Sequence, residues 1–171
     1  TRIDADLTKK IYHRVPILVN EINGSNNWGL AFRQGLFHLT NDLRGSIIVD
    51  GSASTLQSTS DQQPLYEAKM IWHYDHRFST YKLSGNGLIC QSPEDMSVDN
   101  KINPSKNPVG RYYTTNQAIE SRIPKRYHRR WLISYRDITN TVNERTFIAS
   151  ILPRTGVAFT LRVVVEFSRQ I

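Results

Sequence analysis

The sequence is poor in cysteine, in long apolar runs and in the glycine motifs that bind nucleotides. Its single cysteine, Cys90, excludes a disulfide within the chain and, without nearby cysteines, argues against a structural zinc site. No apolar run approaches the roughly 20 residues that a membrane-spanning helix requires. Neither G-x-x-x-x-G-K nor G-x-G-x-x-G occurs. We therefore expect a protein with no membrane partner that binds no nucleotide cofactor itself.

The first residues, Thr1-Arg2-Ile3-Asp4-Ala5-Asp6, include no initiator methionine and no apolar core of a signal peptide. The missing methionine suggests a piece of a longer protein. The missing signal peptide and the single cysteine together predict a soluble protein in the reducing cytoplasm.

Acidic residues are also in short supply. The 171 residues include 22 Lys and Arg but only 15 Asp and Glu, which gives a net charge of +7 and a pI near 9.7. Such an excess of positive charge favours an anionic partner, nucleic acid above all. Because 39% of the residues are hydrophobic, the chain can bury one core of ordinary size. We expect one principal domain.

The spacing of apolar residues predicts an α+β fold, a strand-dominated mixed domain with a short N-terminal helix and two long polar loops. Helices are expected at 4–14 and 115–121, and strands at 28–34, 64–78, 131–138, 146–152 and 157–167. Polar runs at 50–63 and 84–110 predict the two loops, the first of them mobile. The three tryptophans stand beside apolar strands, and we expect them in the core.

One triplet raises an enzymatic alternative. Glu67-Ala68-Lys69, with Asp50 or Asp61 upstream of it, matches the acidic-x-Lys half of a metal-dependent nuclease. The same triplet fits an ordinary ion pair on a strand. His73 and His76 are three residues apart, so on a strand they would point to opposite faces and would not share a metal ion. The sequence has no recognisable catalytic centre, and outside this alternative we expect no catalytic or metal-ligating residue.

The positive charge concentrates in one segment. Residues 122–130 carry five Lys and Arg side chains directly before an expected strand, an arrangement suited to contacts with DNA phosphates. A solvated basic face is the alternative. Two groups of DNA-binding candidates follow: Lys125, Arg126, Arg129 and Arg130 for phosphates, and Arg33, Gln34, His76, Arg77, Arg136 and Arg145 for base edges. Arg136 could instead form an ion pair with Asp137.

Three blocks of sequence then resemble a known family. The blocks are residues 28–42 (WGLAFRQGLFHLTND), 64–81 (PLYEAKMIWHYDHRFSTY) and 129–157 (RRWLISYRDITNTVNERTFIASILPRTGV). They are similar, in the same order, to the region that follows the catalytic domain in a family of DNA adenine methyltransferases. That family comprises the type IIG-like restriction-modification methyltransferases and their relatives in phage defence. In that family an upstream domain binds S-adenosylmethionine and carries an Asn-Pro-Pro-Tyr motif, while the downstream region recognises the target DNA. This chain lacks the tetrapeptide and the methyl-donor glycine motif.

The resemblance implies that residues 1–27 form a linker helix and loop and that residues 28–171 form part of a target-recognition domain. It implies double-stranded DNA and the parent's catalytic methyltransferase domain as partners, with S-adenosylmethionine bound by the parent and no cofactor bound by this chain. Whether this chain has any activity alone is left open. A non-catalytic DNA-binding segment is therefore the leading hypothesis; a metal-dependent nuclease and a structural spacer between the catalytic and recognition domains are the alternatives.

Overall fold

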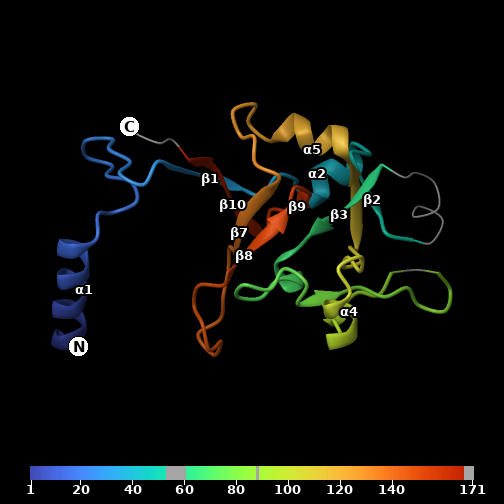
Figure 1. Ribbon diagram of the computed structural model, residues 1–171, viewed down its shortest axis with the longest axis horizontal. Coiled ribbons are helices and arrows are strands. Elements are labelled where there is room, and N and C mark those ends of the chain that lie inside the picture. Colours follow the sequence, from blue (N-terminus) through green and yellow to red (C-terminus); the bar gives the residue numbers. More distant parts are fainter. Residues whose placement is uncertain (53–60, 88, 168–171) are drawn as a thin grey trace. The chain divides into compact units, whose positions relative to one another are not determined.

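The computed structural model describes residues 1–52, 61–87 and 89–167, with most of the expected mobile loop at 50–63 lying outside the described residues (Figure 1). The chain divides into two compact units. The smaller unit holds Thr1–Ala31 and the chain from Glu166 onward, and the larger unit is Phe32–Val165. The boundary between residues 27 and 28 that the family resemblance implies remains a prediction.

Helix α1 (Arg2–Arg14) belongs to the smaller unit and begins two residues before the expected position 4. Its start is fixed by Thr1, whose hydroxyl accepts a hydrogen bond from the Asp4 amide at 3.3 Å, while the Asp4 carboxylate accepts one from the Thr1 amino group at 2.9 Å. Pro16, two residues after the last helical residue, prevents the helix from continuing. No residue of α1 is buried, so packing does not stabilise this helix within its own unit.

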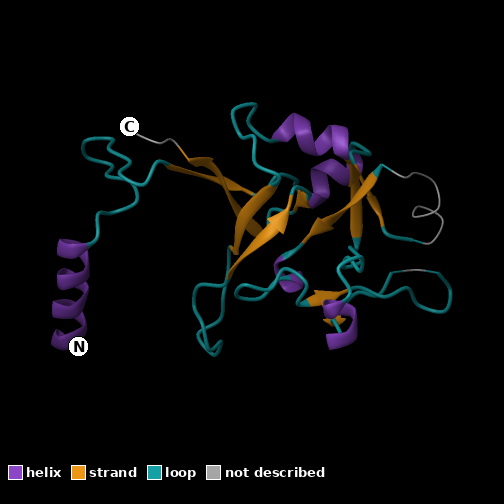
Figure 2. Cartoon of the chain, viewed as in Figure 1, coloured by secondary structure: helices purple, strands orange, loops and turns teal. Residues whose placement is uncertain are grey.

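Ten strands and four α-helices lie in the described ranges, which confirms the strand-dominated α+β fold (Figure 2). One four-stranded sheet has the order β1 (Leu30–Gln34), β10 (Leu161–Phe167), β7 (Trp131–Arg136), β8 (Ala149–Pro153). A second has the order β2 (Ile48–Asp50), β6 (Tyr112–Thr115), β3 (Gln62–Tyr66), β9 (Gly156–Val157), and β4 (Ser79–Thr80) pairs with β5 (Glu94–Asp95). The other helices are α2 (Leu39–Arg44), α4 (Val98–Ile102) and α5 (Asn116–Arg122), with a 3₁₀ turn η1 at Ala68–Met70. Figure 1 places α5 and α4 at opposite ends of the larger unit.

The core of the larger unit forms where the chain passes from the first sheet to the second. After β8 the chain turns at Thr155, and β9 then pairs in parallel with β3, with Leu65 opposite Gly156. Alternation along β7 and β8 buries Leu132 and Leu152, which are opposite each other in the register. Because one face of each strand supplies the core, the other face is left for solvent or for a partner.

Three expectations about local structure need correction. The strand expected at 64–78 ends at Tyr66, because η1 and a tight turn follow it. A strand that was not expected, β6, lies at the centre of the second sheet between β2 and β3. The tryptophans are not core residues: Trp28 is 49% exposed, and Trp72 and Trp131 are half-buried. Each carries a polar ring nitrogen, which favours the edge of a core over its centre.

The loop expected at 84–110 is largely irregular, but it contains β5 and the short helix α4. None of the described helices is both long enough and apolar enough to span a lipid bilayer.

Candidate nucleic-acid interface

The segment between α5 and β7 presents the densest positive charge of the chain. Thr115 caps α5, accepting a hydrogen bond from the Ala118 amide at 3.2 Å, and Pro124 stops the helix just after Arg122. Two buried side chains then anchor the segment: Ile123 packs in the core, and the Tyr127 hydroxyl donates to the Trp131 carbonyl at 2.7 Å. Between and after these anchors stand four exposed cations, Lys125, Arg126, Arg129 and Arg130.

Arg154 holds the backbone of this segment in place. Its guanidinium donates to the carbonyl oxygens of Tyr127 at 3.0 Å and Arg129 at 2.8 Å. The same group binds the Glu120 carboxylate through Nε at 2.6 Å and Nη2 at 2.7 Å, and this lowers the pKa of Glu120. One arginine on the loop after β8 thus fixes the last turn of α5 to the basic segment.

A second arginine, Arg122, ties the end of α5 to Leu36 and to Asp42 of α2. Its two terminal nitrogens each donate to the Asp42 carboxylate at 2.7 Å, and Nη1 also donates to the Leu36 carbonyl at 2.7 Å. The guanidinium lies 4.3 Å from the centre of the Phe37 ring. The ion pair holds the pKa of the buried Asp42 carboxyl below its usual range. Arg122 is therefore committed to the fold, although the sequence grouped it with the exposed cations.

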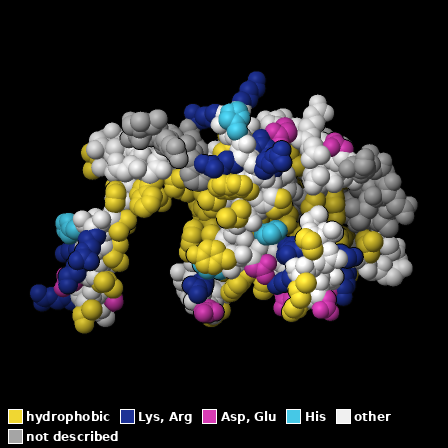
Figure 3. Space-filling view, viewed as in Figure 1, with side chains coloured by type: hydrophobic (Ala, Val, Ile, Leu, Met, Phe, Trp, Pro, Cys, Tyr) yellow, Lys and Arg dark blue, Asp and Glu magenta, His cyan; other side chains and the backbone are white. Residues whose placement is uncertain are grey.

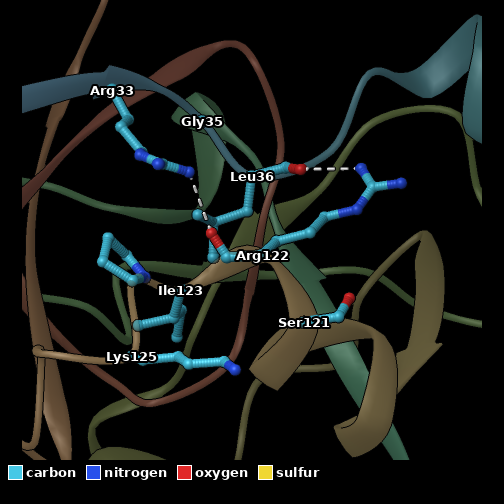
Figure 4. Close-up of a pocket in the computed structure, with 8 residues that line it drawn as sticks. Arg33, Gly35, Leu36, Ser121, Arg122, Ile123 and Lys125 are labelled. Carbon is cyan, nitrogen blue, oxygen red and sulfur yellow. Dashed lines mark hydrogen bonds between the residues drawn. The ribbon is translucent and has the colours of Figure 1, made fainter.

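Two hollows open on either side of Lys125. The first, about 430 Å³, is bordered by Arg33, Arg122 and Lys125, and Figure 4 shows Arg33 and Lys125 approaching it from different sides. Arg33 donates from Nη1 to the Arg122 carbonyl at 3.0 Å, so its positive charge sits at the C-terminal end of α5, where the helix dipole favours it. The second hollow, also about 430 Å³, lies among Lys125, Arg129 and Arg130.

The two hollows have a strongly unbalanced charge. Six Lys and Arg residues border them together, against one carboxylate, that of Glu120. This carboxylate is already bound by Arg154. Lys125 and Arg130 form no ion pair with the described part of the chain, so their charges face solvent. A surface of this kind attracts an anion with several charges spaced along it, such as a nucleic-acid backbone.

The structure brings Arg33 together with the basic segment but places His76, Arg77 and Arg136 elsewhere in the larger unit. Arg77 lies on the turn after η1, where its guanidinium donates to the carbonyl oxygens of Lys101 at 2.5 Å, Asn103 at 3.0 Å and Lys106 at 3.4 Å. It thus binds the end of α4 and the loop after it. His76, beside it, is half-buried, and burial lowers its pKa, which favours the neutral imidazole.

Arg136 also serves the fold, but not through the pair with Asp137 that the sequence suggested. Asp137 instead accepts a hydrogen bond from Arg162 Nε at 2.6 Å. Arg136 donates to the Ile71 carbonyl at 2.6 Å and stacks 4.9 Å from the Trp72 ring centre. Burial lowers the pKa of this guanidinium, and its Nε has no hydrogen-bond partner among the described residues. Partners such as these are distant in sequence, so no local pattern indicates them.

The last two candidates are exposed and lie apart from the basic segment in sequence. Gln34 ends β1, and Arg145 lies in the connection between β7 and β8. Their exposure leaves a DNA contact open to both.

The residues of the nuclease alternative are arranged differently from a metal centre. Glu67 is 6% exposed and binds Arg111 Nη2 at 3.0 Å through one carboxylate oxygen. Burial raises the pKa of Glu67, while the charge of Arg111 and the Tyr81 hydroxyl act in the opposite direction. Asp61 is exposed and accepts a hydrogen bond from the Asn116 side chain at 2.6 Å. Within residues 1–52, 61–87 and 89–167, no group of three or more His, Cys, Asp or Glu side chains could hold a metal ion.

Comparison with known proteins gives no relative: no protein-family model, curated protein or solved structure matches this chain.

Proposed function

We propose that this chain is a non-catalytic DNA-binding segment, the target-recognition part of an adenine-specific DNA methyltransferase of a restriction-modification system. The observation that carries the proposal is the pair of hollows around Lys125, bordered by six cations and a single, already bound carboxylate. The resemblance of three sequence blocks to the recognition region of such enzymes supports the choice of parent. Double-stranded DNA is the proposed partner, and the catalytic domain of the same parent chain is the other.

The arrangement of the arginines suits phosphate binding. Arg154 binds the backbone of the basic segment, and Arg122 ties the end of α5, just before the segment, to Leu36 and Asp42. Lys125, Arg129 and Arg130 are therefore displayed on a rigid support. Rigid display lowers the entropy lost on binding, and phosphate contacts of this kind position a protein on a duplex. Specific reading of bases would fall to other exposed side chains, such as Gln34, which follows Arg33, and Arg145, in the connection between β7 and β8.

S-adenosylmethionine belongs, in this proposal, to the catalytic domain of the parent. The charged side chains that border both hollows are all Lys or Arg except Glu120, and the methyl donor carries a positively charged sulfonium. Like charges repel, so these hollows do not fit the cofactor.

The test is the salt dependence of duplex binding. Fluorescence anisotropy of a labelled 20-base-pair duplex would give the dissociation constant between 50 and 250 mM KCl. The exposed cations that border the hollows are Arg33, Lys125, Arg129 and Arg130, and the exposed Arg126 follows Lys125 in the chain. If each neutralises at most one phosphate, the slope of log K against log salt is expected to be no steeper than about −5.

Charge reversal supplies the matched comparison. The double variant Lys125→Glu, Arg130→Glu is expected to weaken binding about tenfold or more at 150 mM salt and to flatten the slope by about two. The control, Lys69→Glu with Lys106→Glu, changes the net charge equally at exposed positions near η1 and α4, away from α5 (Figure 1). It is expected to alter the affinity by less than about threefold. Absence of duplex binding by the wild-type chain, or equal losses in both double variants, would contradict the proposal.

The same titration separates the alternatives. A structural spacer predicts that both double variants bind DNA like the wild-type chain, because the exposed cations would have no partner. A nuclease predicts magnesium-dependent cleavage that Glu67→Gln abolishes. Intact DNA after incubation with magnesium, together with salt-sensitive binding, supports the DNA-binding segment alone.

A further inference from the structure

The outer face of the four-stranded sheet is apolar and uncovered within the larger unit. Alternation along β7 sends Leu132 and Ser134 into the core, while Trp131, Ile133 and Tyr135 stay half-exposed on the other side. The neighbouring edge strand β8 places Ile151, which is 58% exposed, opposite Ile133. Figure 3 shows hydrophobic side chains gathered over β7 and β8, below a group of Lys and Arg side chains.

Aromatic rings form much of this face. Phe147 is 58% exposed, and its ring centre lies 5.2 Å from that of Tyr135. Phe32, from β1, meets the edge of Tyr135 at 6.3 Å and is itself 39% exposed. Trp131 stands at the other end of β7, about 13 Å from Tyr135 at the usual rise of a strand. A soluble protein seldom leaves several large rings open on one sheet face without a partner.

The border of the face is cationic. The Arg129 guanidinium lies 5.1 Å from the centre of the Trp131 ring. Arg162 stands opposite Tyr135 in the register of β10 and β7, and its charge is shared with Asp137. Arg129 borders the second hollow and also lies over the Trp131 ring, so the hollow adjoins the Trp131 end of the apolar face. A ligand on this face therefore meets aromatic rings and positive charge together.

We propose that this face, defined by Phe32, Trp131, Ile133, Tyr135, Phe147 and Ile151, binds unpaired bases of the nucleic acid whose phosphates occupy the hollows around Lys125. Flat rings beside Arg side chains are the surface on which bases stack, and the continuity with the basic segment lets the phosphates of the same strand stay on the cations. The inference rests on the proposed function, because it assigns a second contact to the same nucleic acid.

The experiment compares two labelled probes on the full chain: a blunt 20-base-pair duplex, and the same duplex with a three-nucleotide thymidine bulge. Wild-type protein is expected to bind the bulged duplex about tenfold more tightly, since stacking of one or more bases on aromatic side chains adds to the phosphate contacts. The double variant Phe147→Ser, Ile151→Ser is expected to lose this preference and to bind the blunt duplex as the wild-type chain does.

A matched control is Ile102→Ser with Val98→Ser, which removes apolar area from α4, where both side chains are more than 70% exposed. This variant should keep the preference for the bulged duplex. Because all four positions are exposed, thermal unfolding by circular dichroism is expected to show intact folding for both variants.

The outcomes separate the two proposals. Duplex binding that is lost on charge reversal, without any preference for the bulge, would overturn this inference and leave the proposed function standing. A preference that survives Phe147→Ser, Ile151→Ser would also overturn it, because the bases would then bind elsewhere. If the chain forms concentration-dependent dimers in sedimentation and Phe147→Ser, Ile151→Ser abolishes them, the face is a contact between copies of the chain. If neither probe binds, both proposals are wrong.

Discussion

Replacing Arg154 by alanine tests whether the basic segment depends on a scaffold outside itself. Arg154 makes two hydrogen bonds to backbone carbonyls at 3.0 and 2.8 Å, which contribute about 1 kcal/mol each once partial exposure is allowed for. The pair with Glu120, whose side chain is 55% exposed, adds about 0.5 kcal/mol. Stacking 6.0 Å from the Tyr127 ring centre adds about 0.5 kcal/mol. The sum predicts that Arg154→Ala lowers the free energy of unfolding by about 3 kcal/mol.

The measurement is urea unfolding followed by circular dichroism, with thermal unfolding beside it, where a loss of this size corresponds to roughly 10 °C for a unit of this length. Two further variants separate the contribution of the ion pair with Glu120 from that of the backbone hydrogen bonds and from the loss of a charge. Glu120→Gln removes only the exposed ion pair and is expected to cost less than about 1 kcal/mol. Arg145→Ala removes an exposed arginine of the same charge and is expected to change the free energy of unfolding by less than about 0.5 kcal/mol.

The reasoning fails if Arg154→Ala is no more destabilising than Arg145→Ala. It also fails if Glu120→Gln costs as much as Arg154→Ala, because the backbone carbonyls would then contribute nothing. DNA binding adds a second criterion: at a temperature where the variant is folded, Arg154→Ala should weaken binding by loosening the segment, although the Arg154 side chain itself is only 22% exposed.

Of three further predictions, two concern supports of the same surface, Gly35 and Asp42, and the third concerns Arg77. A Cβ at Gly35 would lie 2.5 Å from the Ala158 carbonyl oxygen, at a residue whose φ is +49°. Gly35→Ala should therefore lower the free energy of unfolding by at least about 2 kcal/mol. The control Gly85→Ala, whose Cβ would meet nothing within 4 Å, should leave thermal unfolding unchanged. Asp42→Asn should cost about 3 kcal/mol at pH 7. Because the pKa of Asp42 is lowered on folding, its stabilisation is present above the unfolded pKa of about 3.9, and urea titrations should show the difference vanish as pH falls through the folded pKa. Arg77→Lys keeps the charge, but a lysine cannot donate to all three carbonyl oxygens that Arg77 binds. Amide hydrogen exchange in the loop after α4 should therefore become faster. Unchanged exchange together with weaker DNA binding would instead indicate that Arg77 contacts DNA.

Local patterns predicted those parts of the fold that local interactions determine. Helix α1 begins at a capping threonine and ends near a proline, and α5 has the same two signals in Thr115 and Pro124. Strand β7 alternates its burial in the way that its sequence suggests. Strand β6 was missed because its residues, Tyr112–Thr115, gain their partners only from β2 and β3. A sheet centre is a tertiary property, since pairing with distant strands overrides weak local preference.

The division of labour among the arginines was not accessible from the sequence for the same reason. Arg122 ends α5 and begins a basic run, yet its carboxylate partner is 80 residues away. Arg154 binds carbonyl oxygens more than 20 residues away. Where such a partner exists, the guanidinium serves the fold, because a desolvated charge must be paired or hydrogen-bonded. Where none exists, as for Lys125 and Arg130 within the described residues, the charge remains for a ligand. The net charge of +7 therefore measures the attraction for an anion at long range, while the smaller set of exposed cations around Lys125 limits how many phosphates the protein can contact.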